Sequence, residues 1–346
     1  MSSSGYKNPN DFILNERVLN KSSKVKKFLL NLHKKIKPIA TEELKLLEKE
    51  KKSEIFSYDA DFYEKKYKEK KSSLNFQDVS KYFPFFKVFN YLLNLNKELF
   101  DLEFTPCEAK PPHPEMLVYN VYDLKTKTNL GIVFFDILWR DHKEVGAWAA
   151  ELHYSKETKQ RVVSFNTNFD TENGSRNLND ILLDVSDIKT LFHEMGHAIH
   201  FICPKIKYHS HSSETIEWDF IELPSQLYEK WVEDENVLYS MSGHYKTNQK
   251  MDKSDIKKLL DSEKDFQALN YQFLISKSIL DIKLHESKKI KDIAKLEYNV
   301  LKKYQPIAPL KNVSRMMSFS HFFGGGYDVG YYSYVYANVL DSNVWD

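Results

Sequence analysis

Residues 190–202, with the sequence TLFHEMGHAIHFI, constrain the fold of this chain most, because they place several titratable groups in an apolar helix. The run HEMGH matches the pattern H-E-x-x-H. Positions i and i+4 share a helix face, so His193 and His197 can present two imidazoles to one metal ion. Glu194 lies next to that face as a candidate general base. The flanking residues are apolar: Leu191, Phe192, Met195, Ala198 and Ile199.

A metal ion would offset the cost of burying imidazoles and a carboxylate in this helix. The alternative is a helix with surface histidines, which the apolar flanks oppose. A catalytic zinc ion usually takes three protein ligands and one water. Cys203 stands six residues after His197, where some zinc sites have a third histidine. His200 comes too early on the helix, so we interpret it as a supporting or core residue.

A glutamate from a following helix is the other solution for the third ligand. Residues 212–234, SSETIEWDFIELPSQLYEKWVED, offer four candidates: Glu214, Glu217, Glu222 and Glu229. Glu222 lies at the centre of the apolar part of this stretch, among Ile221 and Leu223. On spacing and context, Glu222 is therefore the preferred third ligand.

The composition predicts a globular chain with a substantial core, because 42% of its 346 residues are hydrophobic and 14% are aromatic. The formal net charge of +1 gives no case for nucleic acid or an anionic membrane as the main partner. Cys107 and Cys203 suit a reducing compartment better than a disulfide framework. No apolar run approaches the roughly 18 residues of a membrane span, and the start, MSSSGYKNPNDFI, lacks a signal-peptide segment. A soluble, cytoplasmic protein is expected.

Three regions are expected along the chain, which together predict a mainly α fold with a small antiparallel β-sheet. Residues 1–105 read as helices, with a break at Pro38 and a new start at Thr41 as N-cap. Residues 106–175 contain a predicted hairpin, MLVYNVYD and GIVFFDIL, and a third strand, RVVSFNTNF. Residues 176–346 read as helices and carry the metal-site motif.

Four of the ten glycines lie in the segment GGGYDVG at 324–330. This predicts a backbone that bends sharply or that another chain approaches closely. Tyrosines follow at 327, 331, 332, 334 and 336. If the segment is helical, Tyr327, Tyr331 and Tyr334 share one face, where phenols can donate to a developing oxyanion. Core packing is the alternative interpretation, and the adjacent glycine-rich loop favours the functional one.

Three segments in order resemble the thimet oligopeptidase and oligopeptidase A family of zinc metallopeptidases: TLFHEMGHAIH, EWDFIELPSQLYEKW and SHFFGGGYDVGYYSYVYANVLD. Upstream segments such as YFPFFKVFNYLLNLNKELF resemble the same family more weakly, so the resemblance covers nearly the whole chain. It implies a zincin-like, gluzincin catalytic region of a channel-type oligopeptidase, with the three regions forming one incomplete catalytic domain.

The resemblance also implies one zinc ion and a role for each matching residue. Three positions match the zinc ligands: His193, His197 and Glu222. Three match the catalytic groups: Glu194 as general base, with Tyr331 and Tyr334 as oxyanion donors. Four match positions that contact substrate: His321, Tyr327, Gly325 and Gly326.

The chain departs from the family pattern at three positions near the site. Met195 replaces the usual phenylalanine, Lys189 stands where an acid is usual, and Glu214 replaces a glycine before the third ligand. These changes bear on the orientation of the site and on peptide access, and they remove no ligand. Family members are also considerably longer than this chain.

A zinc-dependent metalloendopeptidase acting on short unstructured peptides is the expected function. In the expected mechanism, zinc lowers the pKa of a water molecule, and Glu194 takes its proton and later transfers a proton to the leaving amine. Two alternatives stay open. One is a truncated, catalytically impaired fragment that binds peptide or a partner chain, including a complementary chain that supplies missing regions. The other is a carboxypeptidase or aminopeptidase with the same ligands.

Overall fold

The computed structural model describes residues 5–6, 8–171, 174–208, 211–212, 215–286, 289–311, 313–324 and 326–345. The chain forms two compact units, each discontinuous in sequence. Unit 1 comprises Met1–Ser73, Glu217–Glu222 and Asp261–Leu340, and unit 2 comprises Leu74–Ile216, Leu223–Leu260 and Asp341–Asp346. The prediction of a mainly helical chain with a small sheet is confirmed. The division into 1–105, 106–175 and 176–346 stays a prediction.

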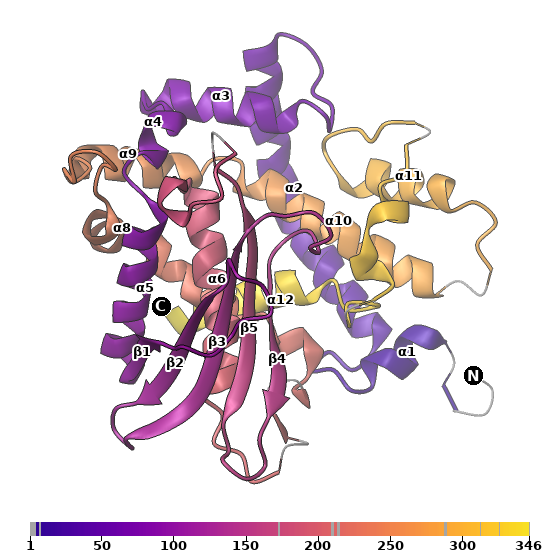
Figure 1. The fold of residues 1–346 in the computed structure, drawn as a ribbon. Helices are drawn as coiled ribbons and strands as arrows, with labels where there is room; N and C mark the ends of the chain where they lie inside the picture. Colours follow the sequence, from indigo (N-terminus) through magenta and orange to yellow (C-terminus); the bar gives the residue numbers. More distant parts are fainter. Residues whose placement is uncertain are drawn as a thin grey trace. The chain divides into compact units, whose positions relative to one another are not determined.

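Unit 2 contains a five-stranded sheet, against which α5 and α6 pack, and further helices (Figure 1). The strands are β1 (Leu102–Pro106), β2 (Leu117–Asp123), β3 (Thr128–Leu138), β4 (Trp148–Tyr154) and β5 (Arg161–Phe169). The helices are α4 (Phe76–Ser80), α5 (Phe85–Phe100), α6 (Val185–Ile202), α7 (Leu223–Glu229) and α8 (Glu235–Met241), with the short 3-10 helices η1 (Leu178–Asp180) and η5 (Lys230–Glu233).

The sheet is mixed, with the strand order β1-β2-β3-β5-β4. The predicted hairpin is confirmed, because β2 and β3 pair antiparallel. The predicted third strand is β5, but it runs parallel to β3, so the prediction of a purely antiparallel sheet is wrong. The reason is β4, which the sequence patterns did not reveal. The chain reverses from β3 into the edge strand β4 and reverses again into β5, which therefore points in the direction of β3.

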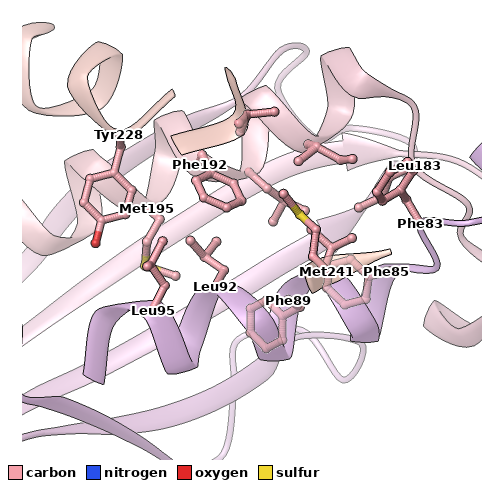
Figure 2. Packing of buried hydrophobic residues seen from close by; sticks show 14 of the residues in the cluster. Phe83, Phe85, Phe89, Leu92, Leu95, Leu183, Phe192, Met195, Tyr228 and Met241 are labelled. Atoms are coloured by element: carbon pink, nitrogen blue, oxygen red, sulfur yellow. The ribbon is translucent and has the colours of Figure 1, made fainter. Parts of the chain in front are cut away.

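Aromatic side chains from α5 and the sheet form the centre of the unit 2 core. Alternate residues of β3 and β5 face this core, as the two-residue period of a strand requires, and Phe135 and Phe165 are fully buried. The Phe135 ring centroid lies 5.0 Å from that of Phe89 and 5.0 Å from that of Phe165. Figure 2 shows Phe85, Phe89 and Leu92 extending from α5 into the same cluster. The sheet, α5 and α6 thus share one core.

Unit 1 is built from helices and short turns. Its helices are α1 (Pro9–Leu14), α2 (Ser22–Lys51), α3 (Ala60–Ser72), α10 (Gln267–Glu286) and α11 (Ile293–Tyr304), with the 3-10 helices η4 (Trp218–Phe220), η6 (Met316–Ser318) and η7 (Ser320–Phe322). The boundary between the units falls within α9 (Lys253–Glu263) and α12 (Ser333–Trp345). The long helices α2 and α10 pack against each other (Figure 1). In the described part of the chain, no helix combines the length and apolar character that crossing a membrane requires.

Helix α2 continues through Pro38, so the predicted break at this residue is wrong. A proline in a helix interior costs about 3 kcal/mol, because it removes a hydrogen bond and crowds the preceding turn. Leu29 before it and Leu47 after it are both fully buried, and this burial on the two sides offsets the cost. Thr41, the predicted N-cap, lies inside the helix, where its Oγ1 donates to the carbonyl of Lys37 at 2.8 Å.

Replacing Phe89 by alanine tests the core of unit 2. The ring is fully buried, so the Phe89→Ala variant should lose about 3–5 kcal/mol of unfolding free energy through lost burial and the cavity left behind. Urea denaturation followed by circular dichroism measures this change. Phe100→Ala is the matched control on the same helix, because Phe100 is 46% exposed and should cost clearly less. Equal losses for the two variants would show that Phe89 does not occupy the core.

Candidate functional site

Helix α6 carries the H-E-x-x-H residues and begins with a capping box. The carboxylate of Asp184 accepts from the backbone N–H of Asp187 at 2.8 Å, and the carboxylate of Asp187 accepts from that of Asp184 at 3.2 Å. This cap fixes the start of the helix two turns before His193. The predicted helix over 190–202 is thereby confirmed as the C-terminal part of α6.

The two imidazoles of α6 lie side by side in unit 2. The ring centroids of His193 and His197 are 4.9 Å apart, with an angle of 81° between the ring planes. His197 is buried, and Glu194 is only 3% exposed. The i, i+4 spacing therefore places both rings on one helix face, as the sequence predicted. Imidazole nitrogens and carboxylate oxygens are donors typical of zinc sites, so these residue types fit that ion.

Glu229, at the end of α7, orients His193. Its Oε1 lies 2.7 Å from Nδ1 of His193, and a carboxylate at this nitrogen accepts a hydrogen bond from it. The tautomer with the proton on Nδ1 leaves Nε2 as the nitrogen suited to a metal ion. The sequence offered Glu229 only as one of four alternative ligands. No local pattern distinguished its supporting role from that of a ligand.

Gly196 allows α6 and α7 to approach each other closely. A Cβ atom on Gly196 would lie 2.6 Å from the carbonyl oxygen of Pro224 and 2.7 Å from the Cα of Ser225. Both distances are shorter than any contact that a real side chain makes with backbone. A glycine between the two histidines is therefore a packing requirement of the α6–α7 contact.

The environments of two other candidate ligands, His200 in α6 and Cys203 at its end, differ in what they imply for metal binding. Burial, followed by the charge of His197, lowers the pKa of His200 to about 4, and the ring of His200 stacks with that of Phe201. Burial raises the pKa of the Cys203 thiol to about 12, whereas the thiolate is the form that binds metals. The protonated thiol disfavours Cys203 as the third ligand, whereas the low pKa of His200 keeps its imidazole neutral and does not argue against metal binding.

The third predicted ligand, Glu222, belongs to unit 1, where it is 1% exposed. The hydroxyl of Tyr327 donates to Oε1 of Glu222. The ring of Tyr327 also packs at 5.2 Å against Trp218, from the 3-10 helix η4. Of the other predicted alternatives, Glu217 is exposed at the start of η4, and Glu214 lies outside the described residues.

The predicted substrate and oxyanion residues form one aromatic cluster in unit 1. Ring centroids are 5.2 Å apart for His321 and Tyr327, 5.1 Å for Tyr327 and Tyr334, and 5.3 Å for Tyr331 and Tyr334. The helical arrangement that the sequence analysis considered for these tyrosines does not apply to Tyr327 and Tyr331, because α12 begins only at Ser333 and the preceding residues form turns. Burial raises the pKa of Tyr327 and Tyr331, which keeps both phenols protonated as donors.

Two buried aspartates hold the turns that carry these tyrosines, and the sequence did not reveal either of them. The carboxylate of Asp281 accepts from the backbone N–H groups of Val329 at 3.0 Å and Tyr331 at 3.1 Å. The carboxylate of Asp219 accepts from the hydroxyl of Tyr332 at 2.7 Å. Val329 has a φ of 57°, unfavourable for a β-branched residue, and the bonds to Asp281 hold it there.

The glycine-rich segment also has a close contact that requires glycine. Gly326 has a φ of 84°, and a Cβ atom there would lie 2.7 Å from ring atoms of Trp218. Gly326 therefore lies against Trp218, which also packs against Tyr327 in unit 1. Gly325, predicted with it as a substrate contact, lies outside the described residues.

The predicted site residues thus fall into two groups, each gathered within its own unit. Unit 2 holds His193, Glu194 and His197, joined by Glu229. Unit 1 holds the acidic and aromatic group: Glu222, His321, Gly326, Tyr327, Tyr331 and Tyr334. The first group offers nitrogen ligands and a general base, and the second offers a carboxylate ligand and phenolic donors.

Comparison with known proteins gives a consistent set of similarities. A family model described as Peptidase family M3 matches residues 2–346. The chain is 30% identical over 335 residues to oligopeptidase A of Salmonella typhimurium, covering 92% of this chain and 48% of that protein. It is 29% identical to oligopeptidase A of Haemophilus influenzae (99% and 52%) and 26% identical to saccharolysin of Saccharomyces cerevisiae (99% and 51%). The chain spans about half the length of these curated relatives.

The contact at Gly196 gives a testable consequence. Gly196→Ala should lower the unfolding free energy by about 1–3 kcal/mol, because the added methyl group meets the backbone of α7 and the two helices must separate. Thermal and urea unfolding measure the loss. Gly243→Ala is the matched control, since its Cβ would meet only the side chains of Lys87 and Asn248, which can move. If Gly196→Ala is as stable as the control, the α6–α7 contact is not as close as described.

Proposed function

The chain belongs to peptidase family M3, and from this premise we propose that it is a zinc-dependent metalloendopeptidase that hydrolyses short, unstructured peptides. The observation that carries the proposal is the imidazole pair of His193 and His197, with Nδ1 of His193 hydrogen-bonded to Glu229. A carboxylate on the far nitrogen is the usual support of a metal-binding histidine. Glu194, beside the pair, is buried, and burying a carboxylate costs free energy that an apolar side chain at this position would avoid. This cost supports a chemical role for Glu194.

We propose His193, His197 and Glu222 as the zinc ligands. Covalent connection supports the third of them, because Glu222 stands two residues before Pro224. The carbonyl of Pro224 lies against Gly196, between the two histidines in sequence. Two residues of chain span at most about 7 Å, so the backbone of Glu222 lies within that reach of Pro224. Tyr327 donates to Glu222 and would fix the orientation of the ligating carboxylate.

In the proposed reaction, a water molecule attacks the scissile peptide carbonyl. When bound, zinc would supply a lowered pKa for that water and polarisation of the carbonyl. Glu194 accepts the proton that the water loses and then transfers a proton to the leaving amine. The phenols of Tyr331 and Tyr334 donate hydrogen bonds to the developing oxyanion. Burial keeps the Tyr331 phenol protonated, as a donor requires.

The remaining predicted residues are proposed to hold the peptide. His321 stacks in the tyrosine cluster, and burial, with the charge of Lys277, lowers its pKa. A neutral imidazole can donate one hydrogen bond and accept another, which suits a peptide backbone. Tyr327, Gly325 and Gly326 complete the proposed substrate contacts. We also propose a cytoplasmic location, supported by Cys107 and Cys203, which are both free thiols.

Two alternatives differ from this proposal by observable outcomes. The first alternative is an impaired fragment that binds peptide. It is motivated by length, because the chain spans about half the length of its relatives. Retained zinc and peptide binding without any cleavage by the wild-type chain would support that fragment. A carboxypeptidase or aminopeptidase would cut only peptides with the corresponding free end, whereas an endopeptidase cuts a peptide blocked at both ends. The comparisons give no support to a complementary chain.

Glu194→Gln tests the general base. The amide cannot accept the proton of the attacking water, so kcat should fall by about 10²–10⁴-fold while zinc stays bound. An internally quenched peptide measures turnover, and atomic absorption measures zinc. Cleavage at the wild-type rate would show that Glu194 is not the base. Loss of zinc together with turnover would instead indicate that Glu194 supports the metal site.

Glu229→Gln tests the support of His193. An amide can place its NH₂ group toward Nδ1 and no longer favours the required tautomer, so zinc affinity should fall by about 10–100-fold. Competition with a chelator of known affinity measures the change. Glu233→Gln is the matched control, because Glu233 is an exposed neighbour on η5 that pairs only with Lys230. Unchanged zinc affinity in Glu229→Gln would remove Glu229 from the site.

A further inference from the structure

Unit 1 contains two adjoining pockets beside α10, on residues that the proposed function does not use. They share four lining residues, which makes them lobes of one cavity: Ser57, Phe273, Gln305 and Arg315. The larger lobe has a volume of about 230 Å³ and the smaller one of about 70 Å³. Together they reach only the lower end of the range of about 300–1,000 Å³ for ligand pockets. The cavity therefore suits a ligand of a few residues.

Charged groups of opposite sign line the two lobes. Asp61 and Glu64 of α3 line the larger lobe, and Lys277 of α10 lines the smaller one. The guanidinium-bearing Arg315 lines both. Aromatic and aliphatic residues fill the rest of the wall, including Phe273. The carboxylate of Glu297 also lines the smaller lobe, where Ser314 and the backbone of Arg315 bind it. The cavity thus has two acids in the larger lobe, Lys277 in the smaller lobe, Arg315 in both and an apolar wall.

The side chains of Glu64, Lys277 and Arg315 form no hydrogen bond or close ion pair within the described residues, although the charge of Lys68 acts on Glu64 and that of Glu297 acts on Lys277. Burial raises the pKa of Glu64 to about 7 and lowers that of Lys277 to about 8. The ammonium of Lys277 lies 4.2 Å from the ring centroids of Phe273 and Phe319, contacts that stabilise it only partly. Glu64 and Lys277 are half-buried, whereas Arg315 is exposed. A half-buried charge without a close ionic partner is costly, and a ligand that supplies the opposite charge offsets this cost.

Two other carboxylates near the cavity, those of Glu297 and Glu43, have hydrogen-bond partners within the chain. Glu297, which lines the smaller lobe, accepts from the hydroxyl of Ser314 at 2.5 Å and from the backbone N–H of Arg315 at 3.1 Å. Glu43 accepts from the backbone N–H of Leu269 at 2.8 Å. Glu297 and Glu43 thus have partners within the chain, whereas Glu64 forms no hydrogen bond or ion pair with a described residue.

We propose that this cavity binds a short peptide, of about two or three residues, with both termini free. Its α-ammonium group lies at Glu64, its α-carboxylate lies at Arg315 and Lys277, and its side chains pack against Phe273. A simple anion would satisfy only the basic end, and a metal cation only the acidic end. A zwitterion with an apolar body is the ligand class that meets all three features. The inference requires peptide binding only and goes beyond the proposed catalytic chemistry.

The cavity adjoins the tyrosine cluster of the same unit. The ammonium of Lys277 lies 5.7 Å from the ring centroid of Tyr331, and Phe319 packs against both Lys277 and Tyr331. A peptide carboxylate that draws Lys277 away from these rings would change the surroundings of the phenol. Binding of a short peptide in the cavity would therefore change the environment of the tyrosine cluster next to it.

The test is a calorimetric titration of the full chain carrying Glu194→Gln with the tripeptide Ala-Leu-Ala. Acetylated and amidated forms of the tripeptide are titrated in parallel, and mass spectrometry verifies that the peptide stays intact. The free tripeptide should bind, and blocking either end should weaken binding by about tenfold or more, because each block removes one charge-assisted contact. Equal affinity for free and doubly blocked peptide, or no binding of the free peptide, would overturn the proposal.

Variants assign each end of the peptide. Glu64→Gln should abolish the preference for a free amino end and keep the preference for a free carboxyl end. Arg315→Met and Lys277→Met should do the reverse. Lys295→Met, on the exposed face of α11, is the matched control for loss of a positive charge and should change neither preference. Preferences that survive in both Glu64→Gln and Arg315→Met would place the peptide elsewhere. Absence of peptidase activity in the wild-type chain would overturn the proposed function and leave these binding results unaffected.

Discussion

The backbone contact between α6 and α7 at Gly196 is the constraint on which the candidate site of unit 2 depends. Because position 196 has no side chain, Pro224 and Ser225 can lie directly against α6. This places the end of α7 where Glu229 accepts a hydrogen bond from His193. A metal-binding imidazole needs one nitrogen without a proton, and the partner of the other nitrogen selects it. The α6–α7 contact at Gly196 therefore serves both the packing of the two helices and the orientation of His193.

Unit 1 positions its functional groups by a different means, because its tyrosines lie in turns. A regular helix satisfies its own backbone groups, whereas a series of turns leaves N–H groups that need partners. Asp281 supplies them for Val329 and Tyr331, and it is fully buried, so water does not compete. Asp219 fixes the hydroxyl of Tyr332 and accepts from the backbone of Val18 and Leu19. Asp281 and Asp219 thus provide hydrogen-bond acceptors that hold these irregular segments in place.

Local patterns in the sequence predicted the features that depend on neighbouring residues. The imidazole pair of His193 and His197 follows from helical spacing alone. The hairpin of β2 and β3 and the strand β5 follow from the β-rich residue patterns of their segments. The parallel pairing of β3 with β5 depends on where β4 lies in the sheet, which no local pattern states. The same holds for Pro38, which α2 tolerates because residues on both sides are buried by distant parts of unit 1.

Within the site, the residues that were missed act on groups distant in sequence. Glu229 is 36 residues from His193, and Asp281 is 48 residues from Val329. A carboxylate that accepts backbone N–H groups and one that binds a ligand look alike in a sequence, since both are acids among apolar residues. They differ in whether the fold supplies donors, which only tertiary structure decides. That criterion separates Glu297, which accepts hydrogen bonds from Ser314 and Arg315, from Glu64, for which we propose a bound ligand as the partner.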